Sequence, residues 1–114
     1  MKTIAFILGA ALAVSAYAGG DAAKGQKKAA EVCAACHGPD GAKPSAPDQP
    51  VLAGQHQDYL ERALTDYKSG RRTNPIMKGF AAQLSDEDIN DVSAYFSSLP
   101  TKLDDLHNHI QGAQ

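Results

Sequence analysis

The hydrophobic positions of this chain recur at the spacing of an α-helix in three segments. These segments span residues 21–32, 57–69 and 86–99. In the third segment one apolar stripe is made by Ile89, Val92, Phe96 and Leu99, with Tyr95 beside it. Residues three and four positions apart share one face of a helix. We therefore predict three helices, each with one buried face.

The residues at the ends of these segments are those that start and stop helices. Asp21 precedes the first segment as a side-chain N-cap. Ser85 stands before the third segment with Asp88 three positions later, which is a capping-box pattern. Gly70 follows the second segment and Pro100 follows the third, and both residue types commonly end helices. The predicted helices thus have defined boundaries.

The segments between the predicted helices look irregular. Residues 38–50 contain four prolines and two glycines, which excludes a helix or a central strand. Residues 71–84 contain Asn74-Pro75 and Gly79, and we predict a second loop there. No run of alternating β-branched residues predicts a strand. The predicted fold class is all-α, with three main helices and long loops. Loops of this length without secondary structure are unusual in a compact domain, so we expect them to wrap around a bound group.

The N-terminal residues have the features of a secretory signal peptide. Lys2 gives a positive start, residues 4–14 are apolar, and Ala16 and Ala18 fit an A-x-A cleavage site. The apolar run is shorter than the roughly 20 residues that span a bilayer. We predict that residues 1–18 are removed, and that the mature chain is exported to a bacterial periplasm without a permanent membrane anchor.

The composition of the mature chain narrows the function classes. Ten basic residues face thirteen acidic ones, and no basic cluster is interleaved with aromatic residues, so a nucleic-acid partner is not expected. The mature chain has five aromatic residues and no tryptophan. A domain of this size is short of core, and a large apolar cofactor would supply the missing volume.

The chain has only two cysteines, and they lie in V-C-A-A-C-H-G at residues 32–38. A redox dithiol at Cys33 and Cys36 would be expected beside a βαβ unit, and a structural zinc site needs a second ligand pair. A disulfide between them would close a very small loop. The motif C-x-x-C-H, with His37 directly after Cys36, is typical of covalent haem attachment. We predict one haem c per chain.

The haem iron then needs a sixth ligand for electron transfer, and methionine or histidine is the usual donor. Met77 is the only methionine left after signal removal, and it falls in a predicted loop. The competing donors are His56, at the start of the second helix, and His107 and His109 in the C-terminal segment. The interpretation favours Met77. The pattern of residues 101–114 predicts no role for that segment.

With this motif, the single methionine and the three helices, the chain resembles the class I monohaem cytochromes c. It is most similar to short bacterial cytochromes of the c-553 kind and to one half of the dihaem bacterial cytochromes c. The resemblance covers nearly all of residues 19–99, within a predicted cytochrome domain of residues 19–100. It implies thioether bonds at Cys33 and Cys36, and His37 and Met77 as the axial iron ligands.

The resemblance also implies a close crossing of the first and last helices. In the family a glycine and an aromatic residue meet there, and the matching positions are Gly25 with Val92 and Tyr95. The usual aromatic partner one turn after the glycine is Ala29 here. This departure leaves open how tightly the two helices cross.

Residues outside the motif are expected to support the haem. In the family a proline carbonyl after C-H-G accepts the Nδ1–H of the histidine, which fixes the ring of His37. Pro47 is the best match and Pro50 the second. Arg71 and Arg72 are candidates for neutralising the haem propionates, although arginines at a helix end also interact with its dipole.

These features predict a soluble electron carrier and not an enzyme. With both axial positions filled, the iron changes charge by one electron without binding a substrate. The expected partners are an upstream reductase and a downstream oxidase or reductase. Two alternatives remain: a cytochrome subunit of a larger respiratory complex, and a haem ligand-binding or peroxidase-type module if Met77 is not a stable ligand.

Overall fold

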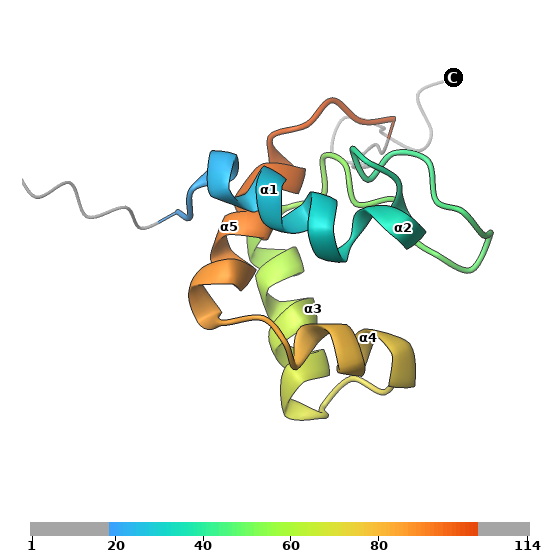
Figure 1. Ribbon diagram of the computed structural model, residues 1–114, viewed down its shortest axis with the longest axis vertical. Coiled ribbons are helices and arrows are strands. Elements are labelled where there is room, and N and C mark those ends of the chain that lie inside the picture. The colour runs from blue at the N-terminus through green and yellow to red at the C-terminus, as the bar shows by residue number, and fades with distance from the viewer. Residues whose placement is uncertain (1–18, 103–114) are drawn as a thin grey trace, which may run out of the picture.

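The computed structural model describes residues 19–102, so the predicted signal peptide and the C-terminal segment with His107 and His109 lie outside the described residues. Helices account for most of the described chain, and Figure 1 shows their arrangement. They are α1 (Ala22–Val32), α2 (Ala34–His37), α3 (Gln57–Ser69), α4 (Pro75–Ala81) and α5 (Asp86–Ser97). Between residues 19 and 102 there is no strand, which confirms the all-α prediction. No helix in this range is long and apolar enough to cross a membrane.

The predicted helix ends are confirmed at the caps. The Asp21 side chain accepts hydrogen bonds from the backbone N–H groups of Ala23 and Lys24. Ser85 and Asp88 form the capping box at the start of α5, with both reciprocal hydrogen bonds present. Gly70 ends α3 in the left-handed conformation, at φ 82°. The helix α5 ends two residues earlier than predicted, within the usual variation of helix ends.

The loop predicted at residues 71–84 is wrong in its centre, because α4 lies there. The Asn74 side chain accepts from the backbone N–H groups of Ile76 and Met77, at 3.1 Å each. Pro75 occupies the first helical position, where its missing N–H costs nothing. The Asn-Pro pair therefore begins a helix instead of marking a loop. As a consequence, Met77 is carried by a helix.

The crossing of α1 and α5 is tight, which answers the question that Ala29 left open. Gly25 is buried, and a Cβ added to it would overlap the backbone carbonyl of Asp91 and crowd the N–H of Val92. Ala29 and Val92 are each only 1% exposed. Tyr95 is also buried, and its ring packs against Phe96 with 5.1 Å between centroids. A small residue at position 29 thus fits between helices that approach this closely.

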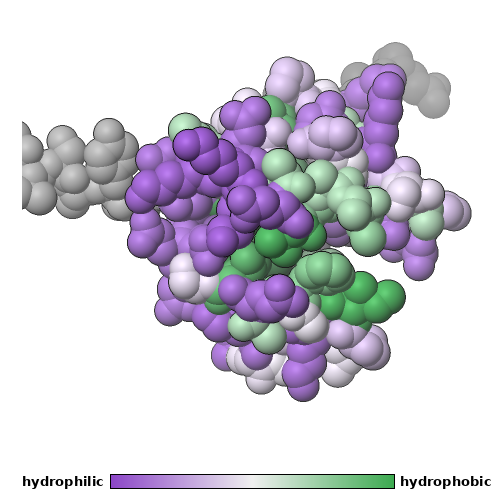
Figure 2. All heavy atoms as spheres, viewed as in Figure 1, coloured by the Kyte–Doolittle hydropathy of each residue, from purple (hydrophilic) through white to green (hydrophobic). Residues whose placement is uncertain are grey.

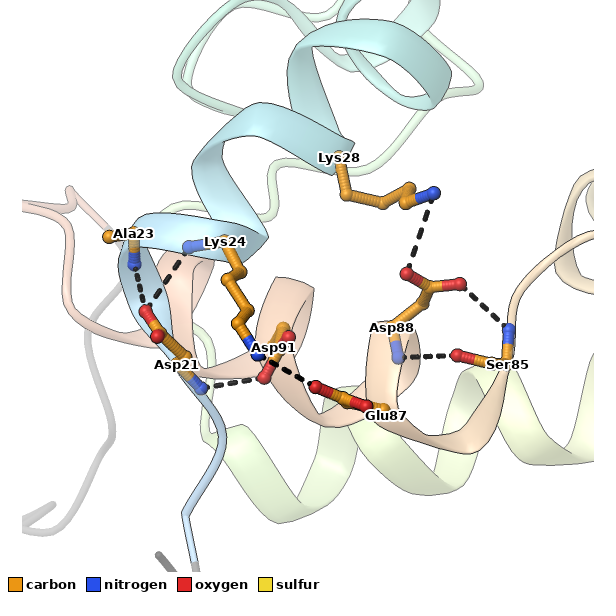
Figure 3. A network of polar contacts seen from close by, with 8 residues as sticks. All are labelled: Asp21, Ala23, Lys24, Lys28, Ser85, Glu87, Asp88 and Asp91. Carbon is orange, nitrogen blue, oxygen red and sulfur yellow. Dashed lines mark hydrogen bonds and ion pairs between the residues drawn. The ribbon is translucent and has the colours of Figure 1, made fainter.

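Polar contacts across the same crossing join the start of α1 to α5, as Figure 3 shows. The buried Asp91 accepts a hydrogen bond from the backbone N–H of Asp21 at 2.6 Å. Two ion pairs on the outside are Lys24–Glu87 at 2.9 Å and Lys28–Asp88 at 3.5 Å. Exposed pairs of this kind contribute little to stability. The buried contact of Asp91 is therefore the main polar link.

Candidate cofactor site

A cavity of about 410 Å³ opens between α2, α3, α4, α5 and the loop before α3. Most of its walls are apolar, and these side chains come from every neighbouring element: Val32, Leu52, Leu60, Ala63, Leu64, Ala81, Leu84, Val92 and Phe96. Figure 2 shows hydrophobic side chains gathered around a hollow in this face, with hydrophilic ones around them. The volume falls in the range of small-molecule and cofactor sites.

Four residues that the sequence singled out line this one cavity. Cys33 lies between α1 and α2, and the single turn of α2 carries Cys36 and His37. That turn is closed by the backbone N–H of His37, which donates to the carbonyl of Cys33 at 3.0 Å. Met77 lines the cavity from α4. The fold therefore brings together two thiols, an imidazole and a thioether from segments forty residues apart.

The ring of His37 is held by a proline carbonyl, but the proline is Pro50 and not Pro47 as predicted. Nδ1 of the 6% exposed His37 lies 2.9 Å from the carbonyl oxygen of Pro50. The carbonyl can only accept, so Nδ1 carries the proton and Nε2 keeps its lone pair for a metal.

The reason for this correction lies in a turn within the loop. The N–H of Gln49 donates to the carbonyl of Ala46 at 3.1 Å, so that Pro47 lies inside the turn and is exposed. Before this turn, the N–H of Ser45 donates to the carbonyl of Cys36 at 2.9 Å. Asp48, Gln49 and Pro50 line the cavity wall, whereas Pro47 does not.

The surroundings of the cysteines argue against a redox dithiol and against zinc. Burial raises the pKa of the Cys33 thiol to about 11, whereas reactive dithiols have a lowered pKa. Cys33 and Cys36 form no disulfide in the structure. No group of three or more histidine, cysteine or acidic side chains placed to hold a metal ion occurs among residues 19–102. Thioether attachment is the chemistry that these two half-buried thiols on the cavity wall fit.

The two candidate arginines occupy different surroundings. Arg72 lines the cavity, and its guanidinium lies 4.9 Å from the ring centroid of Tyr67 and 3.5 Å from the hydroxyl of Tyr59. Arg71 instead pairs with Asp66 at 2.7 Å and is not among the residues that line the cavity. Of the two, only Arg72 is placed beside a group bound in the cavity.

Sequence reasoning missed the wall that α4 builds beside Met77. Ile76 and Phe80 line the cavity from this helix and remain 67% and 37% exposed. The signal was available, because Asn74 and Pro75 are a typical helix start and the apolar residues 76, 77 and 80 have helical spacing. Two thiols, an imidazole with a free Nε2 and a thioether around an apolar cavity together fit a covalently attached haem.

Comparisons with known proteins agree with this chemistry. The family model of cytochrome c matches residues 22–100. The chain is 50% identical to cytochrome c4 of Pseudomonas aeruginosa over 95 residues, which cover 83% of this chain and 46% of that protein. It is 46% identical to cytochrome c-554(548) of Halomonas halodenitrificans over 82 residues, which cover 69% of this chain and 96% of that protein.

A solved structure shares the fold. Reduced recombinant cytochrome c4 from Pseudomonas stutzeri matches with a TM-score of 0.66 and 43% identity, over 74% of this chain and 48% of that one. The chain thus spans about half the length of the cytochromes c4 and nearly the whole of the shorter relative. This chain therefore belongs to the cytochrome c family, has its all-α class I fold, and binds covalently attached haem c.

Proposed function

We propose that this protein is a periplasmic one-electron carrier whose haem iron is held by His37 and Met77. The observation that carries the proposal is that both side chains line one apolar cavity, together with Cys33 and Cys36. Their thiols are the attachment points for the haem. Haem c supplies a metal centre that gains and loses one electron.

The residues around the proposed ligands adjust their donor strength. The carbonyl of Pro50 accepts the Nδ1–H of His37, which fixes the ring plane and makes Nε2 a stronger donor. The neutral thioether of Met77 favours ferrous iron and so raises the reduction potential. The apolar walls, with Leu60 at 6% and Leu84 at 4% exposed, act in the same direction because they disfavour the charge of ferric iron.

Two filled axial positions support a carrier and not an enzyme. A haem enzyme or gas-binding module needs an open or labile sixth position, and Met77 would occupy it. With fixed ligands on both sides, the geometry changes little between the two oxidation states. We propose an upstream reductase and a downstream oxidase or reductase as partners, and gel filtration of a native periplasmic extract distinguishes a free carrier from a subunit of a larger complex.

Arg72 is the residue that we propose beside the haem carboxylates. Its position on the cavity wall supports this role, and the Arg71–Asp66 ion pair removes Arg71 from it. Removal of a positive charge near the iron stabilises the ferric state. Arg72→Gln should therefore lower the reduction potential, with Arg71→Gln as the matched control. Equal potentials in the two variants would contradict the assignment.

We also propose that residues 1–18 are a cleaved export signal and that residues 19–100 are the cytochrome domain. The support is the positive start, the short apolar run and the A-x-A pattern before Gly19. Sequencing the N-terminus of the periplasmic protein tests this proposal. A mature chain that begins at Gly19 supports it, and a chain that retains residues 1–18 contradicts it.

The decisive experiment for the function combines Met77→Ala with carbon monoxide. The reduced wild-type spectrum should not change with carbon monoxide, because the thioether holds the sixth position. Met77→Ala should bind carbon monoxide and have a strongly lowered potential. Met77→His, which restores six ligands, should again exclude the gas. Carbon monoxide binding by the wild type, or an unchanged spectrum in Met77→Ala, would overturn the proposal in favour of a ligand-binding module.

A further inference from the structure

The loop after C-H-G is folded back on itself by one backbone carbonyl. The carbonyl oxygen of Gly41 accepts hydrogen bonds from two successive N–H groups, those of Leu52 at 2.8 Å and Ala53 at 3.2 Å. The N–H of Gly41 donates to the carbonyl of Gly38 at 3.1 Å, at the end of α2. Gly41 thus connects the segment that follows His37 to the segment that follows Pro50.

Gly41 occupies a position that excludes a side chain. The residue is buried and has φ +69°, in the region that favours glycine. A Cβ at this position would lie 2.8 Å from both Cδ1 and Cε1 of Phe96, and 3.1 Å from Cβ of Leu52. Phe96 is itself only 3% exposed, so its ring has little room to move. Any larger residue must therefore shift the backbone at position 41 or the ring beneath it.

The last turn of α5 also contacts both ends of the loop. The carbonyl of Phe96 accepts from the N–H of Gly54 at 2.8 Å, and the hydroxyl of Tyr95 donates to the carbonyl of Pro39 at 3.3 Å. Both contacts flank the double hydrogen bond at Gly41. Pro50, only two residues before Leu52, is therefore positioned by contacts that reach back to α5.

We propose that Gly41 is a positioning residue for the axial histidine. By fixing Leu52 and Ala53 against α5, it sets the position of the Pro50 carbonyl, and with it the 2.9 Å contact to Nδ1 of His37. The inference rests on the proposed function, in which His37 is an iron ligand. Gly41 touches neither the iron nor the ring, and it acts through Pro50.

The expected consequence has a direction. A residue larger than glycine at position 41 displaces residues 50–53, and the hydrogen bond from His37 Nδ1 to Pro50 lengthens. The imidazole then becomes a weaker donor through Nε2, because the hydrogen bond to the carbonyl raises its basicity. A weaker donor stabilises ferrous iron relative to ferric iron. The reduction potential should therefore rise, and the ring plane of His37 should turn.

The test compares Gly41→Ala with Gly20→Ala in the haem-loaded protein. Gly20 has a nearly equal φ of +70°, and its added Cβ would overlap the carbonyl oxygen of Asn90 in α5, away from the cavity. Both variants should lose stability. Only Gly41→Ala should raise the potential and change the pattern of hyperfine-shifted haem methyl resonances in the ferric protein, which reports the orientation of the axial histidine.

The outcomes separate cleanly. Destabilisation of Gly41→Ala with wild-type potential and resonances would overturn the inference and leave Gly41 a purely structural residue. If Gly41→Ala yields no haem protein, Tyr95→Phe loosens the same loop by removing the hydrogen bond to the Pro39 carbonyl, from a residue that does not line the cavity. A raised potential in Tyr95→Phe supports the inference, and a wild-type potential with wild-type resonances overturns it. The spectrum of the wild-type protein is recorded first. If it shows that no histidine is bound to the iron, the proposed function itself is overturned.

Discussion

The crossing of α1 and α5 and the cavity beneath it are stabilised in different ways. At the crossing, protein atoms alone complete the packing: Gly25 lies against the backbone of Asp91 and Val92, and Ala29 is fully enclosed. At the cavity, side chains from α2 to α5 and the loop before α3 line an open hollow of about 410 Å³. One part of this small domain therefore packs on itself, and the other part packs on its cofactor.

The magnitudes support this division. The hollow is open to solvent on one side, so without haem its apolar walls contact water and lose the roughly 25 cal/mol that each Å² of buried apolar surface contributes. The whole free energy of unfolding of a small domain is roughly 5–15 kcal/mol. The cavity half should therefore be unstable without haem. The α1–α5 crossing should be less affected, because its own packing contacts are between protein atoms.

The largest effect is expected from removing the attachment points. Cys33→Ala, Cys36→Ala should prevent covalent attachment and remove much of the roughly 5–15 kcal/mol by which a small domain is stable. Circular dichroism and amide hydrogen exchange measure the result. Protection should vanish first in α3 and α4, and any residual protection should lie in α1 and α5. Wild-type amide protection in all helices of the variant would contradict the claim that the cavity region depends on haem.

A smaller effect is expected from breaking the crossing itself. Gly25→Ala forces a methyl group into the carbonyl of Asp91, and overpacking of this kind costs about 1–3 kcal/mol or more. Denaturant unfolding of the haem-loaded protein measures the loss, while the absorption spectrum should keep its wild-type form. Gly79→Ala is the control, because nothing lies within 4 Å of its added Cβ. A lost spectrum in Gly25→Ala would show that the two regions are not separable.

A milder substitution, at the N-cap of α5, tests the same helix crossing. The Ser85 side chain accepts from the N–H of Asp88 at 3.0 Å, and Ser85→Ala should lower the free energy of unfolding by about 1 kcal/mol. Chemical denaturation gives the value. The reduction potential should not move, because the cap lies outside the residues that line the cavity. A shift of the reduction potential without loss of stability would contradict the separation between the α1–α5 crossing and the cavity.

The smallest effect is a pH dependence at the same cap. The backbone N–H of Ser85, helped by its hydroxyl and by Lys28, lowers the pKa of Asp88 below its ordinary value of 3.8. This contribution is therefore present above about pH 4 and is lost as the pH falls through the lower folded pKa. The stability advantage of the wild type over Asp88→Asn should shrink on acidification. A stability difference between the wild type and Asp88→Asn that grows at low pH would contradict this prediction.

Local signals in the sequence were sufficient for three helices and for the haem-binding motif. Periodicity and caps gave α1, α3 and α5 nearly to the residue, because α1 and α5 begin at side-chain caps and α3 ends at the left-handed Gly70. The α4 helix was missed because Asn-Pro occurs in loops as well as at helix starts. The presence of Met77 in the site was still found, because only one methionine remains in the mature chain.

The remaining errors concern choices that tertiary contacts decide. The sequence pattern ranks Pro47 before Pro50, but in the folded loop it is the Pro50 carbonyl that faces His37. The adjacent Arg71 and Arg72 diverge because Asp66 pairs with only one of them. Residue type does not distinguish such neighbours, because the path of the backbone through each turn decides which of the two faces the cavity.

The central claim is that the sulfur of Met77 and the imidazole of His37 hold the iron in one cavity. The most direct measurement is the near-infrared absorption of the ferric protein, where methionine–ferric ligation gives a weak band. The wild type should show this band, and Met77→Ala should lose it while retaining covalently bound haem. A wild-type protein without the band, or a Met77→Ala protein that keeps it, would contradict the account.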